Sequence, residues 1–109
     1  MPAMLKGYID RVFLNGFAFK YTENGAEGLL NGKKAIIFQT TGQPKDSLDA
    51  YGLISPLKVS MEMGTLAFTG IETVAHSFFH AVPYVSDEDR KNMLNEVKQV
   101  LSKLVIANV

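Results

Sequence analysis

A short apolar run near the middle of the chain restricts the fold more than any other feature. Residues 33–40 read Lys-Lys-Ala-Ile-Ile-Phe-Gln-Thr and lie between a glycine turn and a polar loop. The run does not alternate as a half-exposed strand would, so it predicts a strand buried on both faces, and such strands belong to parallel sheets. Parallel strands need a long crossover, usually helical, so we expect an α/β fold.

Helical periodicity begins close to the N-terminus. Leu5, Ile9, Val12 and Phe13 recur at helical spacing, and Pro2 suits a first turn. Residues 15–32 contain four glycines and little periodicity, which predicts a long ordered loop. We therefore expect one amphipathic helix, then a loop, before the apolar strand.

The second half of the chain repeats the pattern. After a loop over 41–49, residues 51–68 indicate a helix that Gly70 ends, and β-branched and aromatic residues over 71–82 predict a second strand. Ser86 is the expected N-cap of a last helix to Val105, with acidic residues in its first turn. Its apolar stripe comprises Met93, Leu94, Val97, Val100, Leu101, Leu104 and Val105.

Composition narrows the class of protein. The 109 residues indicate one domain over 1–109, and a formal net charge of zero gives no field to attract nucleic acid. Without cysteine, disulfides, thiolate metal sites and cysteine nucleophiles are excluded, and a reducing compartment suits the chain. We see no signal peptide and no run near the ~20 apolar residues of a membrane span, so we expect a cytoplasmic protein.

The expected order α-β-α-β-α contains too few strands for its class. A doubly wound sheet normally has about five strands, and two strands with three helices leave edges and faces uncovered. The pattern therefore suggests that part of a larger fold is missing.

Two segments carry a family resemblance. Residues 1–13, Met-Pro-Ala-Met-Leu-Lys-Gly-Tyr-Ile-Asp-Arg-Val-Phe, with Gly-Phe-Ala-Phe-Lys-Tyr at 16–21, closely resemble the helix and aromatic loop of flavodoxin-like NAD(P)H:quinone oxidoreductases. Gly-Lys-Lys-Ala at 32–35 through Thr-Thr-Gly at 40–42 resembles the next strand and its flavin-contacting loop. Residues 21–35 are also similar to the FMN-dependent azoreductases.

The resemblance implies a flavodoxin-like doubly wound parallel sheet, truncated to its C-terminal α-β-α-β-α portion. Family members begin with a strand and a phosphate-binding loop, and the step that resembles Met1 to Ala3 lies in the middle of their chains. A late start codon, a split gene or a processed fragment would each produce this arrangement. We therefore expect either a separately encoded N-terminal half or its loss.

The resemblance also assigns site residues. It implies that Thr40, Thr41, Gly42 and Gln43 bind the flavin ring and that Tyr51 is catalytic, its hydroxyl lying near that ring. Phe19 and Tyr21 match an aromatic pair that lines the substrate pocket across a homodimer interface; packing against the first helix is the alternative. Physical reasoning supports the loop, because ligands of open α/β sheets lie beyond the carboxyl ends of strands.

Two histidines raise a metal hypothesis that their setting disfavours. His76 and His80 are four residues apart, which on a helix would place both imidazoles on one face. In the expected strand they lie roughly 13 Å apart, too far for one ion. We assign no metal site. The family's catalytic histidine lies in the loop after Gly42, and this loop contains none.

Two functions of different classes follow. In the first, the chain is an oxidoreductase that uses FMN or FAD to pass two electrons from NADH or NADPH to a quinone or azo-type acceptor. In the second, it is an incomplete fold without flavin, acting as an oligomer-forming or regulatory subunit. In both we expect a dimer or higher homo-oligomer, because the strand over Lys34 to Gln39 would lose a neighbour and expose an edge.

Overall fold

The computed structural model describes residues 1–107, with side chains to residue 105, and divides into two compact units. The first unit contains residues 1–35 and 55–73, and the second contains residues 36–54 and 74–109. Strands β3 (Lys34–Thr40) and β4 (Glu72–Phe79) each begin in the first unit and continue in the second.

In the first unit, helix α1 (Ala3–Val12) follows Pro2 as expected. Lys6 and Asp10 form an ion pair of 2.6 Å on its exposed side. Ile9, Val12 and Phe13 are half-buried, whereas Leu5 is exposed, so the apolar stripe is narrower than the sequence pattern.

A β-hairpin replaces the long loop expected over residues 15–32. Strand β1 (Phe19–Thr22) pairs antiparallel with β2 (Gly25–Gly28), and Thr22 stands opposite Gly25. The Thr22 hydroxyl donates to the Gly25 carbonyl at 2.9 Å, and Gly25 has a φ of +106°, a conformation that glycine adopts without steric cost. The loop prediction was wrong because glycines occur both in tight hairpin turns and in loops. Without an alternating apolar pattern in the flanking residues, the sequence does not distinguish the two.

The helix expected over residues 51–68 is three shorter pieces. Helix α3 (Ile54–Met61) passes into a π-helical turn over Glu62–Leu66 and then a 3-10 turn over Ala67–Thr69. Gly70, at φ +92°, ends the segment as predicted. The buried residues of this unit form its small core and are Ala18, Leu66, Thr69 and Ile71.

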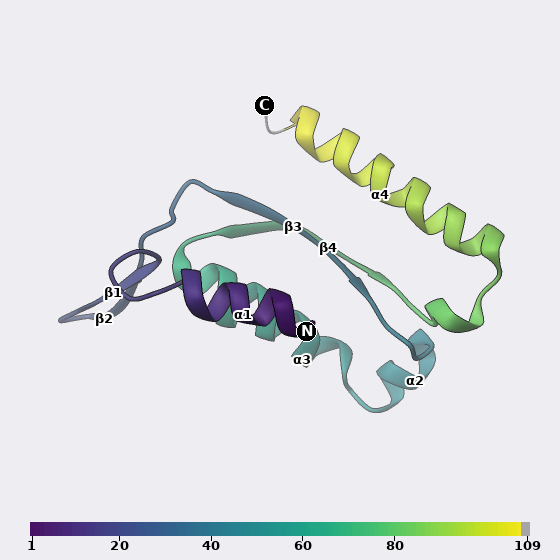
Figure 1. The fold of residues 1–109 in the computed structure, drawn as a ribbon, viewed down its shortest axis with the longest axis horizontal. Helices are drawn as coiled ribbons and strands as arrows, with labels where there is room; N and C mark the ends of the chain where they lie inside the picture. Colours follow the sequence, from purple (N-terminus) through teal and green to yellow (C-terminus); the bar gives the residue numbers. More distant parts are fainter. Residues whose placement is uncertain (108–109) are drawn as a thin grey trace. The chain divides into compact units, whose positions relative to one another are not determined.

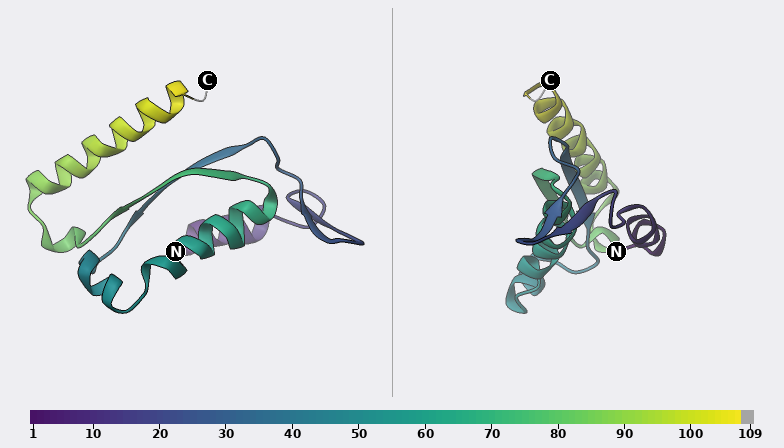
Figure 2. Two further views of the ribbon diagram at one scale, coloured as in Figure 1. Left: turned by 180° about the vertical axis from the view of Figure 1, so that it is seen from behind. Right: turned by 90° about the vertical axis from the view of Figure 1, so that its left-hand side faces the viewer.

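Strands β3 and β4 form a parallel pair, with Lys33 and Glu72 in the first unit and Thr41 and Phe79 in the second. Glu72 N–H donates to the Lys33 carbonyl and Thr41 N–H donates to the Phe79 carbonyl, so both strands run in the same direction. Figures 1 and 2 show the two strands side by side along their length. The prediction of a strand buried on both faces was wrong: within the described residues β4 is the one strand neighbour of β3, and no residue of β3 is fully buried.

Two boundaries in the second unit also differ from expectation. The loop expected over 41–49 contains helix α2 (Lys45–Ala50), which begins after Pro44. Strand β4 ends at Phe79, not at residue 82, because Ala81 takes a left-handed conformation and Val82–Tyr84 form a 3-10 turn. The carboxyl end of β4 is therefore a sharp turn.

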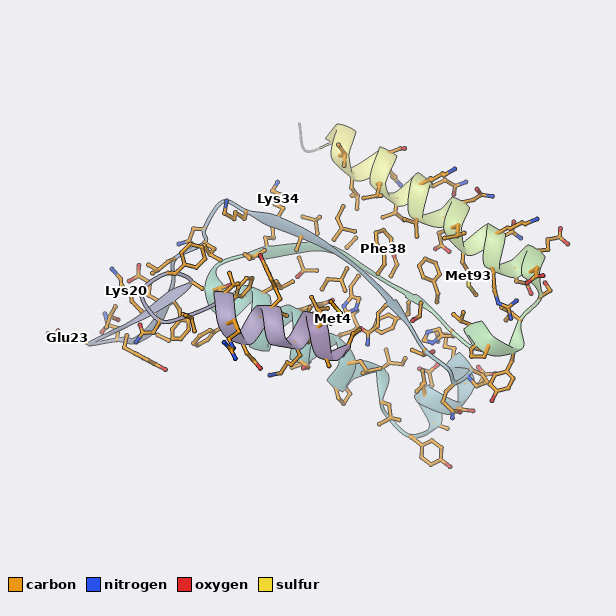
Figure 3. All side chains as sticks on the ribbon, viewed as in Figure 1. Met4, Lys20, Glu23, Lys34, Phe38 and Met93 are labelled. Atoms are coloured by element: carbon orange, nitrogen blue, oxygen red, sulfur yellow. The ribbon has the colours of Figure 1, made fainter. Side chains whose placement is uncertain are left out.

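Helix α4 (Asp87–Ala107) forms as its caps predict. The Ser86 hydroxyl accepts the Asp89 N–H at 3.1 Å, and Arg90 donates to the Val82 carbonyl at 2.9 Å, which ties the helix start to the preceding turn. Met93, Val97, Val100 and Leu104 are half-buried, while Leu94, Leu101 and Val105 are exposed. Figure 3 shows Phe38 on the side of β3 that faces α4, with Met93 on the facing side of the helix.

Candidate functional site

The loop expected to contact a cofactor lies at the carboxyl end of β3. Thr40 is the last residue of the strand, and Pro44 precedes α2. Thr41 continues the ladder by donating its N–H to the Phe79 carbonyl at 2.9 Å and is half-buried, whereas Gly42 and Gln43 are exposed. The loop is therefore a short exposed turn held at one end by the parallel pair.

Two backbone donors of this loop are unused. Within the described part of the chain, the N–H groups of Gly42 and Gln43 have no hydrogen-bond acceptor. A Cβ added to Gly42 would meet no atom within 4 Å, and the φ of this glycine is not left-handed, so neither packing nor backbone conformation requires glycine here. The loop leaves an open approach beside free donors, and these features fit the edge of a planar flavin ring.

Tyr51 lies in the same unit, after the end of α2. Its N–H donates to the Ser47 carbonyl at 3.2 Å, and its side chain is 80% exposed. Within residues 1–107 its hydroxyl has no hydrogen-bond partner. Tyr51 is accessible to a ligand, but no hydrogen bond links it to the Thr40–Gln43 loop.

Phe19 and Tyr21 belong to the first unit, on one side of β1. Their rings meet edge to face at 5.7 Å, and the Phe19 ring also packs on Phe68 at 5.0 Å. Phe19 is half-buried, whereas Tyr21 is 70% exposed. The ring of Phe19 thus packs on the 3-10 turn before β4, and Tyr21 is the more accessible of the two.

His76 lies in β4 and His80 directly follows that strand, and each histidine has a separate partner. His76 Nε2 lies 2.9 Å from Gln39 Oε1, and His80 Nδ1 lies 2.9 Å from Thr41 Oγ1. The Phe78 ring stacks between them, 4.5 Å from His76 and 5.7 Å from His80. Across the residues with described side chains, no group of three metal-ligating residues gathers.

Sequence reasoning did not connect His80 to the candidate loop. Thr41 and His80 are 39 positions apart in the sequence. Thr41 directly follows β3 and His80 directly follows β4, and these two strands are paired in parallel. The contact could have been predicted from the two expected parallel strands, because the carboxyl ends of adjacent parallel strands meet at one edge of the sheet.

Comparison with known proteins identifies the class. Residues 1–104 match the model of a family described by its flavodoxin-like fold. A solved structure, Smu.1420 from Streptococcus mutans, is 33% identical, with a TM-score of 0.74 over 92% of this chain and 52% of that one. The chain belongs to this flavodoxin-like family, and the predicted fold class is confirmed.

Curated relatives carry names of redox enzymes. An uncharacterized NAD(P)H oxidoreductase of Haemophilus influenzae is 38% identical over 90% of this chain and 48% of its own length. The human ribosyldihydronicotinamide dehydrogenase [quinone] is 34% identical over 95% of this chain and 46% of its own length. An FMN-dependent NADH:quinone oxidoreductase of Coprothermobacter proteolyticus is 32% identical over 91% of this chain and 48% of its own length.

This chain spans about half the length of the curated relatives it matches. Among the described residues, no helix combines the length and apolar character that crossing a membrane would require.

Proposed function

We propose that this chain carries the flavin-ring loop of an NAD(P)H-dependent oxidoreductase that reduces quinones, with azo compounds as a second acceptor class. The observation that carries the proposal is the pair of unused N–H groups at Gly42 and Gln43, beside open space at the carboxyl end of a parallel strand. The names of the relatives support the reaction class.

The roles of the residues follow from their chemistry. A bound FMN or FAD supplies two-electron transfer between NADH or NADPH and the acceptor. The N–H groups of Gly42 and Gln43 donate to acceptors on the edge of the ring and stabilise negative charge there, with Thr40 and Thr41 holding the loop. The exposed Tyr51 hydroxyl donates to a developing oxyanion, and Phe19 and Tyr21 line the acceptor pocket.

Assembly is part of the proposal. Within the described residues one edge of β3 has no partner strand, and this edge suits a second strand, supplied by another copy of this chain or by a separately encoded N-terminal half. A cytoplasmic location agrees with the cysteine-free composition.

The test is a flavin titration followed by fluorescence and by the amide signals of Gly42 and Gln43. If the contacts are to the ring, riboflavin and FMN should bind this chain equally, because neither Gly42 nor Gln43 needs the phosphate. Without a phosphate anchor a loss of about 4 kcal/mol weakens binding roughly a thousandfold, so we expect no submicromolar affinity.

Two results would count against this function. Amide signals of Gly42 and Gln43 that do not move at saturating riboflavin would remove the ring site from this loop. A chain without any flavin binding, alone or with its oligomeric partner, would favour the flavin-free regulatory subunit.

A further inference from the structure

Four hydrogen bonds join the candidate loop to the residues that follow β4. Each connects a group in the Thr40–Gln43 loop with a group in the segment 79–82. They are Thr41 N–H to Phe79 O at 2.9 Å, Ala81 N–H to Gln43 O at 3.0 Å, Val82 N–H to Thr41 O at 3.2 Å, and the 2.9 Å contact between Thr41 Oγ1 and His80 Nδ1. The loop is therefore bonded on both sides of Gly42, while Gly42 itself is left free.

The Thr41 hydroxyl determines whether His80 donates or accepts in the hydrogen bond between them. Thr41 Oγ1 also lies 2.9 Å from the Gln43 carbonyl, which can only accept. A hydroxyl has one proton, so when it donates to this carbonyl it must accept from His80. His80 then carries its proton on Nδ1, and the parallel Phe78 ring, at an interplanar angle of 2°, restricts rotation of the imidazole.

Ala81 explains why two backbone donors reach the same loop. It has φ +53° and ψ +34°, a left-handed conformation that a residue with a Cβ adopts at a cost. The turn presents the successive N–H groups of Ala81 and Val82 to the Gln43 and Thr41 carbonyls. Such strain persists where surrounding contacts hold it, and it is concentrated at functional sites.

From these contacts we infer that His80 is a positioning residue for the ring-binding loop. By donating Nδ1–H to Thr41 it holds the loop in the conformation that leaves the Gly42 and Gln43 N–H groups available for a ligand. This inference rests on the proposed function for the identity of the ligand, whereas the contact itself belongs to the unliganded chain. His80 is not catalytic in this scheme, because it acts through Thr41.

The first test uses the unliganded chain. Imidazole ¹⁵N shifts should show His80 protonated on Nδ1 in its neutral form, and the Ala81 and Val82 amides should be protected from exchange. A neutral His80 with its proton on Nε2 would overturn the inference, because Nδ1 could then not donate.

The second test separates the two ring nitrogens by substitution. The amide nitrogen of His80→Asn reproduces the Nδ1 donor, whereas that of His80→Gln reproduces Nε2. We expect His80→Gln to weaken riboflavin binding by about tenfold, the value of one hydrogen bond, and to expose the Ala81 and Val82 amides, while His80→Asn restores both.

His76 provides the matched control. It lies in β4 and bonds Gln39 through Nε2, away from the loop, so His76→Asn should leave riboflavin affinity unchanged. Equal losses in His76→Asn and His80→Gln would mean a general role in strand pairing and would overturn the positioning role. If the unsubstituted chain binds no riboflavin, the proposed function fails, and the ring shifts and amide protection still decide whether His80 holds the loop.

Discussion

Gly28, at the end of β2, lies directly against the backbone of Gly70, and a Cβ added to Gly28 would come within 2.4 Å of the Gly70 nitrogen. The neighbouring Leu30 N–H donates to the Thr69 carbonyl at 2.8 Å, so the hairpin and the 3-10 turn meet through backbone groups. Backbone atoms cannot rotate away as a flexible side chain does. The hairpin can therefore pack against the backbone of Gly70 only because residue 28 is a glycine.

We accordingly expect Gly28→Ala to destabilise the chain by about 1–3 kcal/mol, the usual cost of overpacking. Gly7→Ala is the matched control, since Gly7 has no neighbour within 4 Å of an added Cβ and lies in a helix, where alanine stabilises by up to about 1 kcal/mol. Urea unfolding of both variants measures the difference. Equal midpoints would show that the contact between Gly28 and Gly70 relaxes at no cost.

Gly42→Val tests the ring site without disturbing the fold. The Cβ of an added side chain meets no protein atom within 4 Å, so we expect unchanged helical circular dichroism and an unchanged unfolding midpoint. The same side chain would occupy the approach to the free donors, and riboflavin binding should fall by at least about tenfold, the value of one lost hydrogen bond. Gly7→Val, equally open, should bind normally. Full binding by Gly42→Val would place the flavin elsewhere.

Tyr51→Phe should separate chemistry from binding. The Tyr51 hydroxyl has no partner within residues 1–107, so its removal leaves stability and riboflavin affinity unchanged. Steady-state reduction of benzoquinone by NADH should show kcat lowered by about 10²-fold, typical of one lost oriented donor. Tyr84→Phe, a tyrosine with 82% exposure in the same unit, is the control. Identical rates for both variants would remove Tyr51 from the reaction.

The free edge of β3 predicts self-association. In this strand alternate N–H groups point to β4, and since Thr41 N–H does so, the Ile36 N–H points to the open edge. Sedimentation should show a species larger than the 12.0 kDa chain at micromolar concentration. Ile36→Pro should shift it toward monomer, because proline cannot donate, while Ile36→Ala controls for the lost side chain. A monodisperse monomer of the unsubstituted chain would refute edge pairing.

The ion pair between Lys45 and Asp49 makes the stability of helix α2 depend on pH in the alkaline range. The hydrogen bond from Lys45 to Asp49, at 2.7 Å, and then the charge of Asp49, raise the pKa of Lys45 above its ordinary value of 10.5. A raised pKa means that the pair stabilises the helix fully below pH 10.5 and loses this effect as pH rises through the raised value. A ¹³C titration of Lys45 should show the upward shift, and Asp49→Asn should remove most of it. Identical titrations in both would contradict the pairing.

Features that depend on neighbouring residues could be predicted from the sequence. The Ser86 cap, the acidic first turn of α4 and the end of the third helical segment at Gly70 all depend on contacts within a few positions. The same holds for α1 after Pro2 and for the strand that became β3. Their physical causes, namely capping, helical periodicity and a local apolar run, are complete within one segment.

Tertiary structure decided the features that require two distant segments to meet. The β1–β2 hairpin needs the backbone of Thr69 and Gly70 beside Gly28, and the extent of α4 burial depends on which sheet face covers it. The contact between Thr41 and His80 arises because parallel pairing brings two strand ends together, and the turn at the left-handed Ala81 donates two N–H groups to the loop carbonyls. Chain connectivity does not specify such pairings; the free energy of the whole packed arrangement does.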